Sequence, residues 1–249
     1  IIYSGVESSQ YRTNFADFNL IKVIYSGRIE QKQKNIIDIA NEFIRLIKEG
    51  RAYEFTILGS GSKADEVQEA INSSGCQNKI KMIPTLYGVD YKKELAKHHV
   101  ILLYSDFEGT PGSILDAMSC GLIPVSSNYE GVEEVIEKEF NGYILEHLSE
   151  LDKVLCALGD NITLAKEMSQ RNLELIQTKF SIEIAARKWI EFINQVYYFR
   201  VSIEDKCFPK KIKLPKKHNL LFEHRSWNDR PFVKRCFYKL KYYINHRNE

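Results

Sequence analysis

Short apolar runs alternate with helical segments along most of the chain. Six runs have the near-continuous apolar character of buried parallel strands: 21–26, 53–58, 80–83, 100–104, 123–126 and 142–145. Apolar residues recur at helical spacing between them, over 36–47, 64–72, 90–97 and 113–119, whereas 28–35 is polar and predicts a loop. This alternation predicts an α/β fold, a doubly wound parallel sheet covered by helices on both faces.

The carboxyl-terminal part differs from the rest in pattern and charge. From residue 151 to about 198 the pattern is helical throughout, with a helix start at Ser181. Residues 200–249 hold 14 Lys/Arg against 5 Asp/Glu, whereas the preceding residues hold 21 against 28. We therefore predict an opening segment over 1–20, a Rossmann-like domain over 21–199 and a basic extension over 200–249.

The basic extension suggests an anionic partner. Over 231–247 the aromatic and aliphatic side chains fall on one helical side and most lysines and arginines fall elsewhere. Such a helix can lie in a membrane interface, which predicts an anionic membrane surface as partner. The alternative is a helix packed on the protein body. Nucleic acid is not expected, because no reading motif accompanies the charge.

Composition indicates an ordinary globular protein. Apolar residues make up 44% and charged residues 27%, and no run approaches the roughly 20 apolar residues of a membrane-spanning helix. The five cysteines are scattered without a C-x-x-C pair, which fits reduced thiols and a cytoplasmic location. The chain opens on Ile1 without a signal peptide, so we expect a fragment or a processed chain.

The stretch 108–125, EGTPGSILDAMSCGLIPV, carries the most informative chemistry. It follows an apolar run, passes through small residues and enters a helix, which is the geometry that holds a phosphate on backbone N–H groups. Glu108 and Asp116 at either end can hold hydroxyls of a sugar and a ribose. Alternatively, the two acids are a loop acid and a helix N-terminal acid favoured by the dipole, and Pro111 with Gly112 only marks a turn.

Four stretches together resemble the carboxyl-terminal, nucleotide-sugar-binding domain of retaining GT-B glycosyltransferases of family 4, glycosyl transferases group 1. In chain order they are IYSGRIEQKQKN, FTILGSGS, VILLYSDFEGTPGSILDAMSCGLIPV and EGVEEVIEKEFNGYIL. The resemblance covers about residues 21–198, and IIYSGVESSQYR resembles the segment that joins the family's two domains. It implies that the amino-terminal acceptor domain is absent. Asp116 stands where the family usually has Glu.

The resemblance implies a catalytic set and a donor-binding set. Arg28 and Lys34 would contact the diphosphate, and Lys34 is preferred to Lys32 because it directly precedes Asn35 and the helix. Glu108 would orient the donor sugar. The donor-binding residues would lie at the turn after the first strand, in the small-residue loop and the helix that follows it, and at the end of the third strand. They are Gly27 at the turn, Thr110, Pro111, Gly112 and Ser113 in the loop, Asp116 for the ribose, and Pro84 and Thr85 beside the nucleobase.

Each of these assignments has a simpler alternative. Taken alone, Arg28 and Glu30 could be a solvated ion pair on the surface of an ordinary loop, and such a pair contributes little to stability. Pro84 and Thr85 read equally well as a strand-ending turn. No His/Cys/Asp cluster has metal-ligand spacing, and the family fold needs no divalent ion, so neither a metal nor another cofactor is expected.

The implied function is transfer of a sugar, with retention, from a nucleotide-sugar donor to a saccharide or lipid-linked saccharide. We expect the chain to be inactive without an acceptor domain. Two alternatives stay open: a non-catalytic nucleotide-sugar-binding subunit of a split enzyme, and a GT-B-fold nucleotide-sugar epimerase. The AMSCG sequence that follows Asp116 argues against the epimerase.

Overall fold

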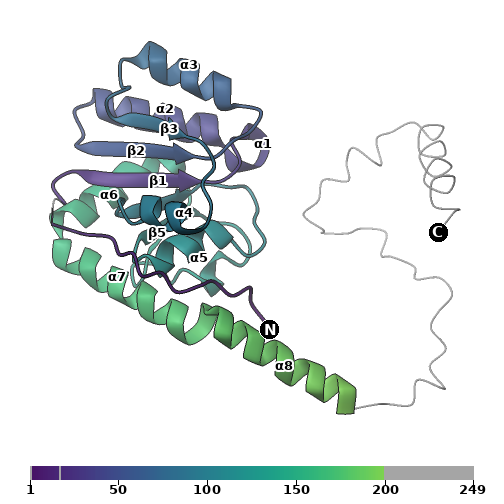
Figure 1. The fold of residues 1–249 in the computed structure, drawn as a ribbon. Helices are drawn as coiled ribbons and strands as arrows, with labels where there is room; N and C mark the ends of the chain where they lie inside the picture. Colours follow the sequence, from purple (N-terminus) through teal and green to yellow (C-terminus); the bar gives the residue numbers. More distant parts are fainter. Residues whose placement is uncertain (1, 17, 199–249) are drawn as a thin grey trace, which may run out of the picture. The chain divides into compact units, whose positions relative to one another are not determined.

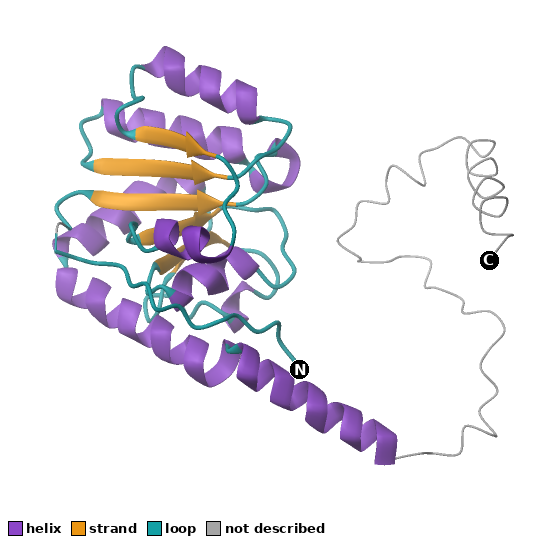
Figure 2. Cartoon of the chain, in the orientation of Figure 1, coloured by secondary structure: helices purple, strands orange, loops and turns teal. Residues whose placement is uncertain are grey.

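A computed structural model describes residues 2–16 and 18–198, which form a six-stranded sheet with flanking helices. All neighbouring strands run parallel, as the arrows in Figure 2 show. Across the sheet the order is β3 (Ile80–Ile83), β2 (Tyr53–Leu58), β1 (Ile21–Ser26), β4 (Val100–Leu103), β5 (Ile123–Ser127) and β6 (Tyr143–Leu145). The predicted fold class is confirmed, and each strand lies within one residue of its predicted bounds.

The described helices connect and follow the strands (Figure 1). They are α1 (Gln31–Lys34), α2 (Ile36–Lys48), α3 (Ala64–Ser74), α4 (Gly88–Leu95), α5 (Gly112–Ser119), α6 (Leu151–Asp160), α7 (Ile162–Leu175) and α8 (Ile182–Tyr198). Short 3-10 turns cover Val132–Glu134 and Leu148–Glu150, and a π-helical turn, Ile176–Phe180, joins α7 to α8. The prediction that 28–35 is only a loop is wrong, because it contains α1.

Two apolar clusters cover the two faces of the sheet. The smaller one joins Ile24 and Ile101 of the central strands to Leu95 of α4 and Ala117 of α5. The larger one contains buried residues of α2, α3, α6 and α7 together with alternate strand residues such as Val23. Neighbouring residues of β1 therefore point into opposite layers, as a doubly wound sheet requires.

The strand order reverses direction between β1 and β4. The chain first builds outward from β1 to β2 and β3, then returns to place β4, β5 and β6 on the other side. β1 pairs with β2 at six positions, from Ile21↔Tyr53 to Ser26↔Leu58, but with β4 at only two. We call this β1–β4 junction the seam. In open α/β sheets, ligands bind at the carboxyl ends of strands beside such a reversal.

Two glycine turns at the carboxyl ends of β1 and β2 pack backbone against backbone. A Cβ on Gly59 would lie 1.9 Å from the carbonyl oxygen of Gly27, and one on Gly61 would lie 2.3 Å from that of Ile29. The Ile29 N–H donates to the Ser60 carbonyl at 2.9 Å. Only residues without side chains allow this approach, which fixes the start of the loop that carries Arg28.

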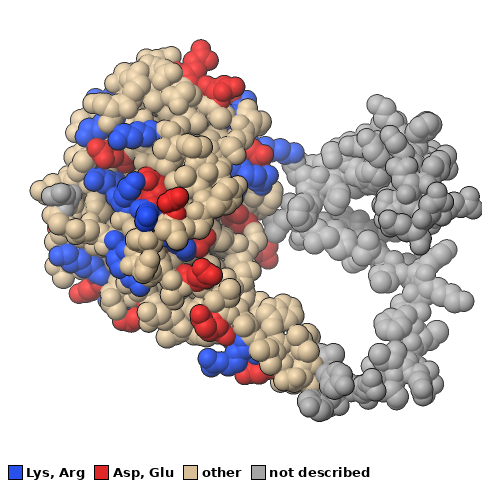
Figure 3. Space-filling view, viewed as in Figure 1, with Lys and Arg blue, Asp and Glu red and all other residues tan. Residues whose placement is uncertain are grey.

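The opening segment runs beside the start of α8. The Val6 N–H donates to the Phe180 carbonyl at 2.9 Å, and the Ile182 N–H donates back to Val6 at 3.1 Å. Further along α8 several large apolar side chains are exposed, Trp189, Ile190, Phe192 and Ile193. On the face drawn in Figure 3, positive and negative side chains are interspersed rather than gathered by sign.

The predicted basic extension over 200–249 lies outside the described residues, so its membrane contact stays a prediction. Within residues 2–16 and 18–198 no helix combines the length and apolar character needed to cross a membrane.

Candidate functional site

A buried tyrosine contacts the backbone of the turn after β1. Tyr25 is fully buried, and its hydroxyl donates to the Arg28 carbonyl at 2.5 Å. A Cβ on Gly27 would lie 3.0 Å from that hydroxyl oxygen. Gly27 therefore leaves room for the tyrosine that sets the path of the following residues.

Arg28 lies at the surface of the site, with its side chain 60% exposed. Its Nη1 contacts Glu30 Oε2 at 3.0 Å, and its Nη2 donates to Gln33 Oε1 at 2.6 Å. The Glu30 contact is the surface pair that the simpler alternative predicted. The Gln33 contact goes further, because Gln33 Nε2 donates to the Phe107 carbonyl at 2.8 Å and so links Arg28 to the loop after β4.

A largely buried ion pair bridges the seam at the carboxyl ends of β1 and β4. Lys34 Nζ lies 2.5 Å from Glu108 Oε1, and each side chain is 11% exposed. Lys34 ends α1 because Asn35 adopts a left-handed conformation, with φ of 48°. Asn35 Nδ2 donates to Asp106 Oδ1 at 2.7 Å, which ties this corner to the same loop. Lys32 is exposed on the same helical turn.

Burial and the charge of Glu108 raise the pKa of two tyrosines. Burial raises the pKa of Tyr25, and the nearby Glu108 carboxylate raises it further. The pKa of Tyr129, which follows β5 and is 5% exposed, is also raised mainly by burial, with Glu108 contributing. Both phenols therefore stay neutral around pH 7 and can donate hydrogen bonds beside a carboxylate.

The small-residue loop leads into α5. Thr110 and Gly112 are exposed, Pro111 is buried and Ser113 is half-buried. Gly112 opens the helix, and a Cβ there would meet nothing within 4 Å. The first N–H groups of any helix lack intrahelical partners, so they can donate to a ligand. Phosphate binding at this helix start remains a prediction.

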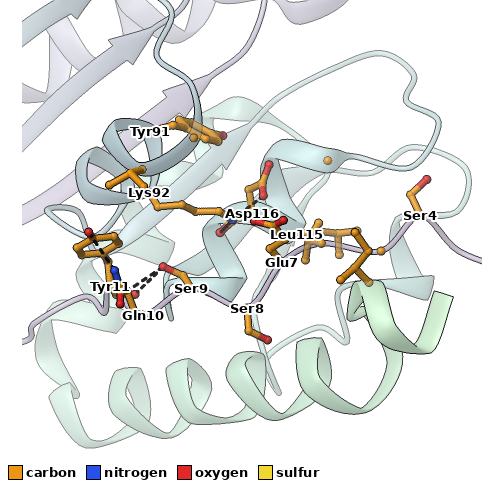
Figure 4. Close-up of a pocket in the computed structure, with 16 residues that line it drawn as sticks. Ser4, Glu7, Ser8, Ser9, Gln10, Tyr11, Tyr91, Lys92, Leu115 and Asp116 are labelled. Atoms are coloured by element: carbon orange, nitrogen blue, oxygen red, sulfur yellow. Dashed lines mark hydrogen bonds and ion pairs between the residues drawn. The ribbon is translucent and has the colours of Figure 1, made fainter. Parts of the chain in front are cut away.

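Asp116 is paired with a lysine that sequence reasoning did not single out. Its Oδ1 lies 2.5 Å from Lys92 Nζ, across from α5 to α4. Figure 4 shows the two side chains pointing toward one another. Lys92 is one of several lysines in the stretch 92–97, and only the crossing of the two helices distinguishes it from its neighbours.

Two spaces open at the surface, one beside Arg28 and one beside Asp116. One, of about 340 Å³, is lined by Gly27, Arg28 and Thr85 among others. The other, of about 720 Å³, is lined by Gly112, Asp116 and the opening segment. Tyr91 lines both, and its hydroxyl lies 3.0 Å from Ser26 Oγ.

Four of the predicted donor-binding residues line these two spaces: Gly27 and Thr85 line the smaller one, and Gly112 and Asp116 line the larger one. The other four, Thr110, Pro111, Ser113 and Pro84, line neither space, and neither do Lys34 and Glu108. Pro84 is exposed at the end of β3, whereas its neighbour Thr85 donates to Ser60 Oγ at 3.3 Å. Within the described part of the chain, no group of three or more His, Cys, Asp or Glu residues could hold a metal ion.

The family model described as glycosyl transferases group 1 matches residues 21–161, more than half of the chain. The chain belongs to this family.

The curated relatives include two bacterial glycosyltransferases. The amylovoran biosynthesis glycosyltransferase AmsK of Erwinia amylovora is 24% identical over 77% of this chain and 49% of its own length. The poly(ribitol-phosphate) alpha-N-acetylglucosaminyltransferase of Staphylococcus aureus is 26% identical over 64% of this chain and 32% of its own. The chain therefore spans about half or less of these family members.

Solved structures show the same fold. The carboxyl-terminal domain of a glycosyl transferase group 1 protein, LpcC of Francisella tularensis, matches along its whole length and 72% of this chain, with a TM-score of 0.61 and 18% identity. Anabaena HepE in complex with UDP and glucose gives a TM-score of 0.67 and 16% identity, over 78% of this chain and 56% of HepE. The sheet is the Rossmann-like fold of GT-B carboxyl-terminal domains.

Proposed function

We propose that the chain is the donor-binding domain of a family 4 glycosyltransferase that transfers a sugar, with retention, from a nucleoside diphosphate sugar. The observation that carries this proposal is the Lys34–Glu108 pair, buried at the point where the strand order reverses. A largely buried cation and carboxylate at the carboxyl ends of two parallel strands suit a ligand with both phosphate and hydroxyl groups.

The chemistry follows from where charge develops. As the bond between sugar and diphosphate breaks, negative charge grows on the leaving phosphate. Fixed cations stabilise that charge more in the transition state than in the ground state. In the proposal Arg28 and Lys34 supply them, and Glu108 accepts hydrogen bonds from the donor sugar. Arg28 has the exposure needed to turn from Glu30 to a ligand.

The relatives support the substrate classes. HepE and the pneumococcal O-GlcNAc transferase GtfA have structures with UDP and a sugar, so we propose a UDP-sugar as donor. Relatives are named for amylovoran, poly(glycerol-phosphate) and poly(ribitol-phosphate), which favours a cell-surface saccharide or lipid-linked acceptor. Acceptor binding and turnover would need a partner domain, and we place the reaction in the cytoplasm, where such donors are made.

Calorimetric titration of the chain with UDP, GDP, ADP and their sugars tests the proposal. We expect one base to be preferred. Arg28→Met should weaken nucleoside diphosphate binding by roughly tenfold, in line with loss of a charged hydrogen bond. Arg45→Met, which removes another surface arginine paired with Glu42 and Glu49, is the matched control and should change nothing. Absence of binding to every nucleotide would refute the proposed function.

A further inference from the structure

Lys92 makes a set of contacts centred on one acid. Besides Asp116 Oδ1 at 2.5 Å, its Nζ donates to Ser119 Oγ at 2.9 Å. Ser119 Oγ in turn donates to the Asp116 carbonyl at 2.7 Å. The side chains of Lys92 and Asp116 are 16% and 30% exposed, so the pair is largely but not fully shielded from water.

This pair lies in the wall of the larger space. Lys92 and Asp116 line the 720 Å³ opening together with Tyr91, which it shares with the space beside Gly27 (Figure 4). A ligand that reaches from one space to the other passes Tyr91, and in the larger space it meets the wall that contains Asp116. Lys92 contacts one oxygen of that carboxylate, Oδ1.

A carboxylate has two oxygens and about four sites at which it can accept hydrogen bonds. The described contact with Lys92 uses Oδ1. The ammonium thus fixes the rotation of the short aspartate side chain and leaves Oδ2 to accept from a ligand hydroxyl. An aspartate without such a partner would rotate freely and lose side-chain entropy on binding.

We propose that Lys92 is a positioning residue for ribose recognition: it holds Asp116 so that Oδ2 faces the ribose hydroxyls of the bound nucleotide. This rests on the proposed donor-binding function. The competing explanation is that Lys92 only ties α4 to α5. A structural tie would change the stability of the chain, but it would not change how well the site distinguishes a ribose from a sugar without hydroxyls.

The test uses UDP, GDP and ADP, each titrated beside its 2′,3′-dideoxy form. For the base that binds, we expect the wild-type chain to prefer the ribo form by roughly tenfold or more, as loss of a hydrogen bond to a charged group predicts. Lys92→Met should reduce this ratio to below about threefold, and Lys92→Arg should keep most of it. Lys97→Met removes an exposed lysine paired with Glu94 and should leave the ratio unchanged.

Ser119→Ala provides a milder variant if Lys92→Met does not fold. It removes one of the groups that hold the ammonium and should lower the ratio to an intermediate value. An unchanged or higher ratio in Lys92→Met, or in Ser119→Ala where that variant replaces it, would overturn the proposal while leaving the donor function standing. Binding without any preference for the ribo form would do the same. If no nucleotide binds, the donor function and this proposal fail together.

Discussion

The Lys34–Glu108 pair allows the sharpest test of how this site is built. Replacing Lys34 by Met leaves the Glu108 carboxylate in a site where its side chain is only 11% exposed. Replacing Glu108 by Gln leaves the Lys34 ammonium in the same position without its partner. Each single substitution therefore leaves one charge without its partner, whereas the double substitution removes both charges.

The expected cost follows from burial. Breaking a fully buried pair by removing one partner costs about 3–5 kcal/mol, because an uncompensated charge stays buried. Here each side chain keeps some contact with water, so we expect about 2–3 kcal/mol for each single variant. The double variant should recover most of that loss, which gives a coupling energy of about 2 kcal/mol.

Urea denaturation of the four proteins measures these values, with Arg45→Met as the exposed reference. Arg45 pairs with Glu42 and Glu49, its side chain is 46% exposed, and its loss should cost under about 1 kcal/mol. The double variant should fold well and still bind nucleotide sugars poorly. Single variants that cost under about 1 kcal/mol and add without coupling would refute the reasoning.

Two further predictions concern the backbone and pH. In urea denaturation, Gly59→Ala should lower the free energy of unfolding by more than about 3 kcal/mol, because the added Cβ would meet the Gly27 carbonyl. Gly50 also has a positive φ but has open space around it, so Gly50→Ala should lower the free energy of unfolding by only about 1–2 kcal/mol. Burial lowers the pKa of His98 below its ordinary value of 6.5, so the unfolded chain binds a proton there more readily than the folded chain does. The stability that neutral His98 contributes should therefore be lost as pH falls below 6.5. The urea midpoints of wild type and His98→Gln should converge between pH 7 and 5.

The strands and the location of the site could be predicted from sequence because both depend on local patterns. The apolar run 21–26 ends at a glycine, and β1 occupies that run. Carboxyl ends of parallel strands share one edge, so Arg28 and Glu108 could be expected near each other before any coordinates. Lys34, which directly precedes Asn35, is the lysine that meets Glu108, while its contact with a diphosphate stays a prediction.

The rest depends on tertiary contacts that leave no local pattern. The sequence of α1, QKQK, has no apolar face and reads as a loop. The structure holds it through Gln33 and Lys34, whose partners lie more than seventy residues later in the 106–108 loop. The Lys92–Asp116 pair likewise exists only because α4 crosses α5. Propensity and periodicity cannot report such contacts.

The uneven pairing of β1 has a consequence for motion. Six paired positions join it to β2 and two join it to β4, so the sheet consists of two strongly hydrogen-bonded halves connected by a narrow strip. If the two halves open as separate cooperative units, their amides exchange with solvent at separate rates. A nucleotide that contacts residues on both sides would fasten the halves together. Amide exchange in β1 and β4 should then slow in step on binding.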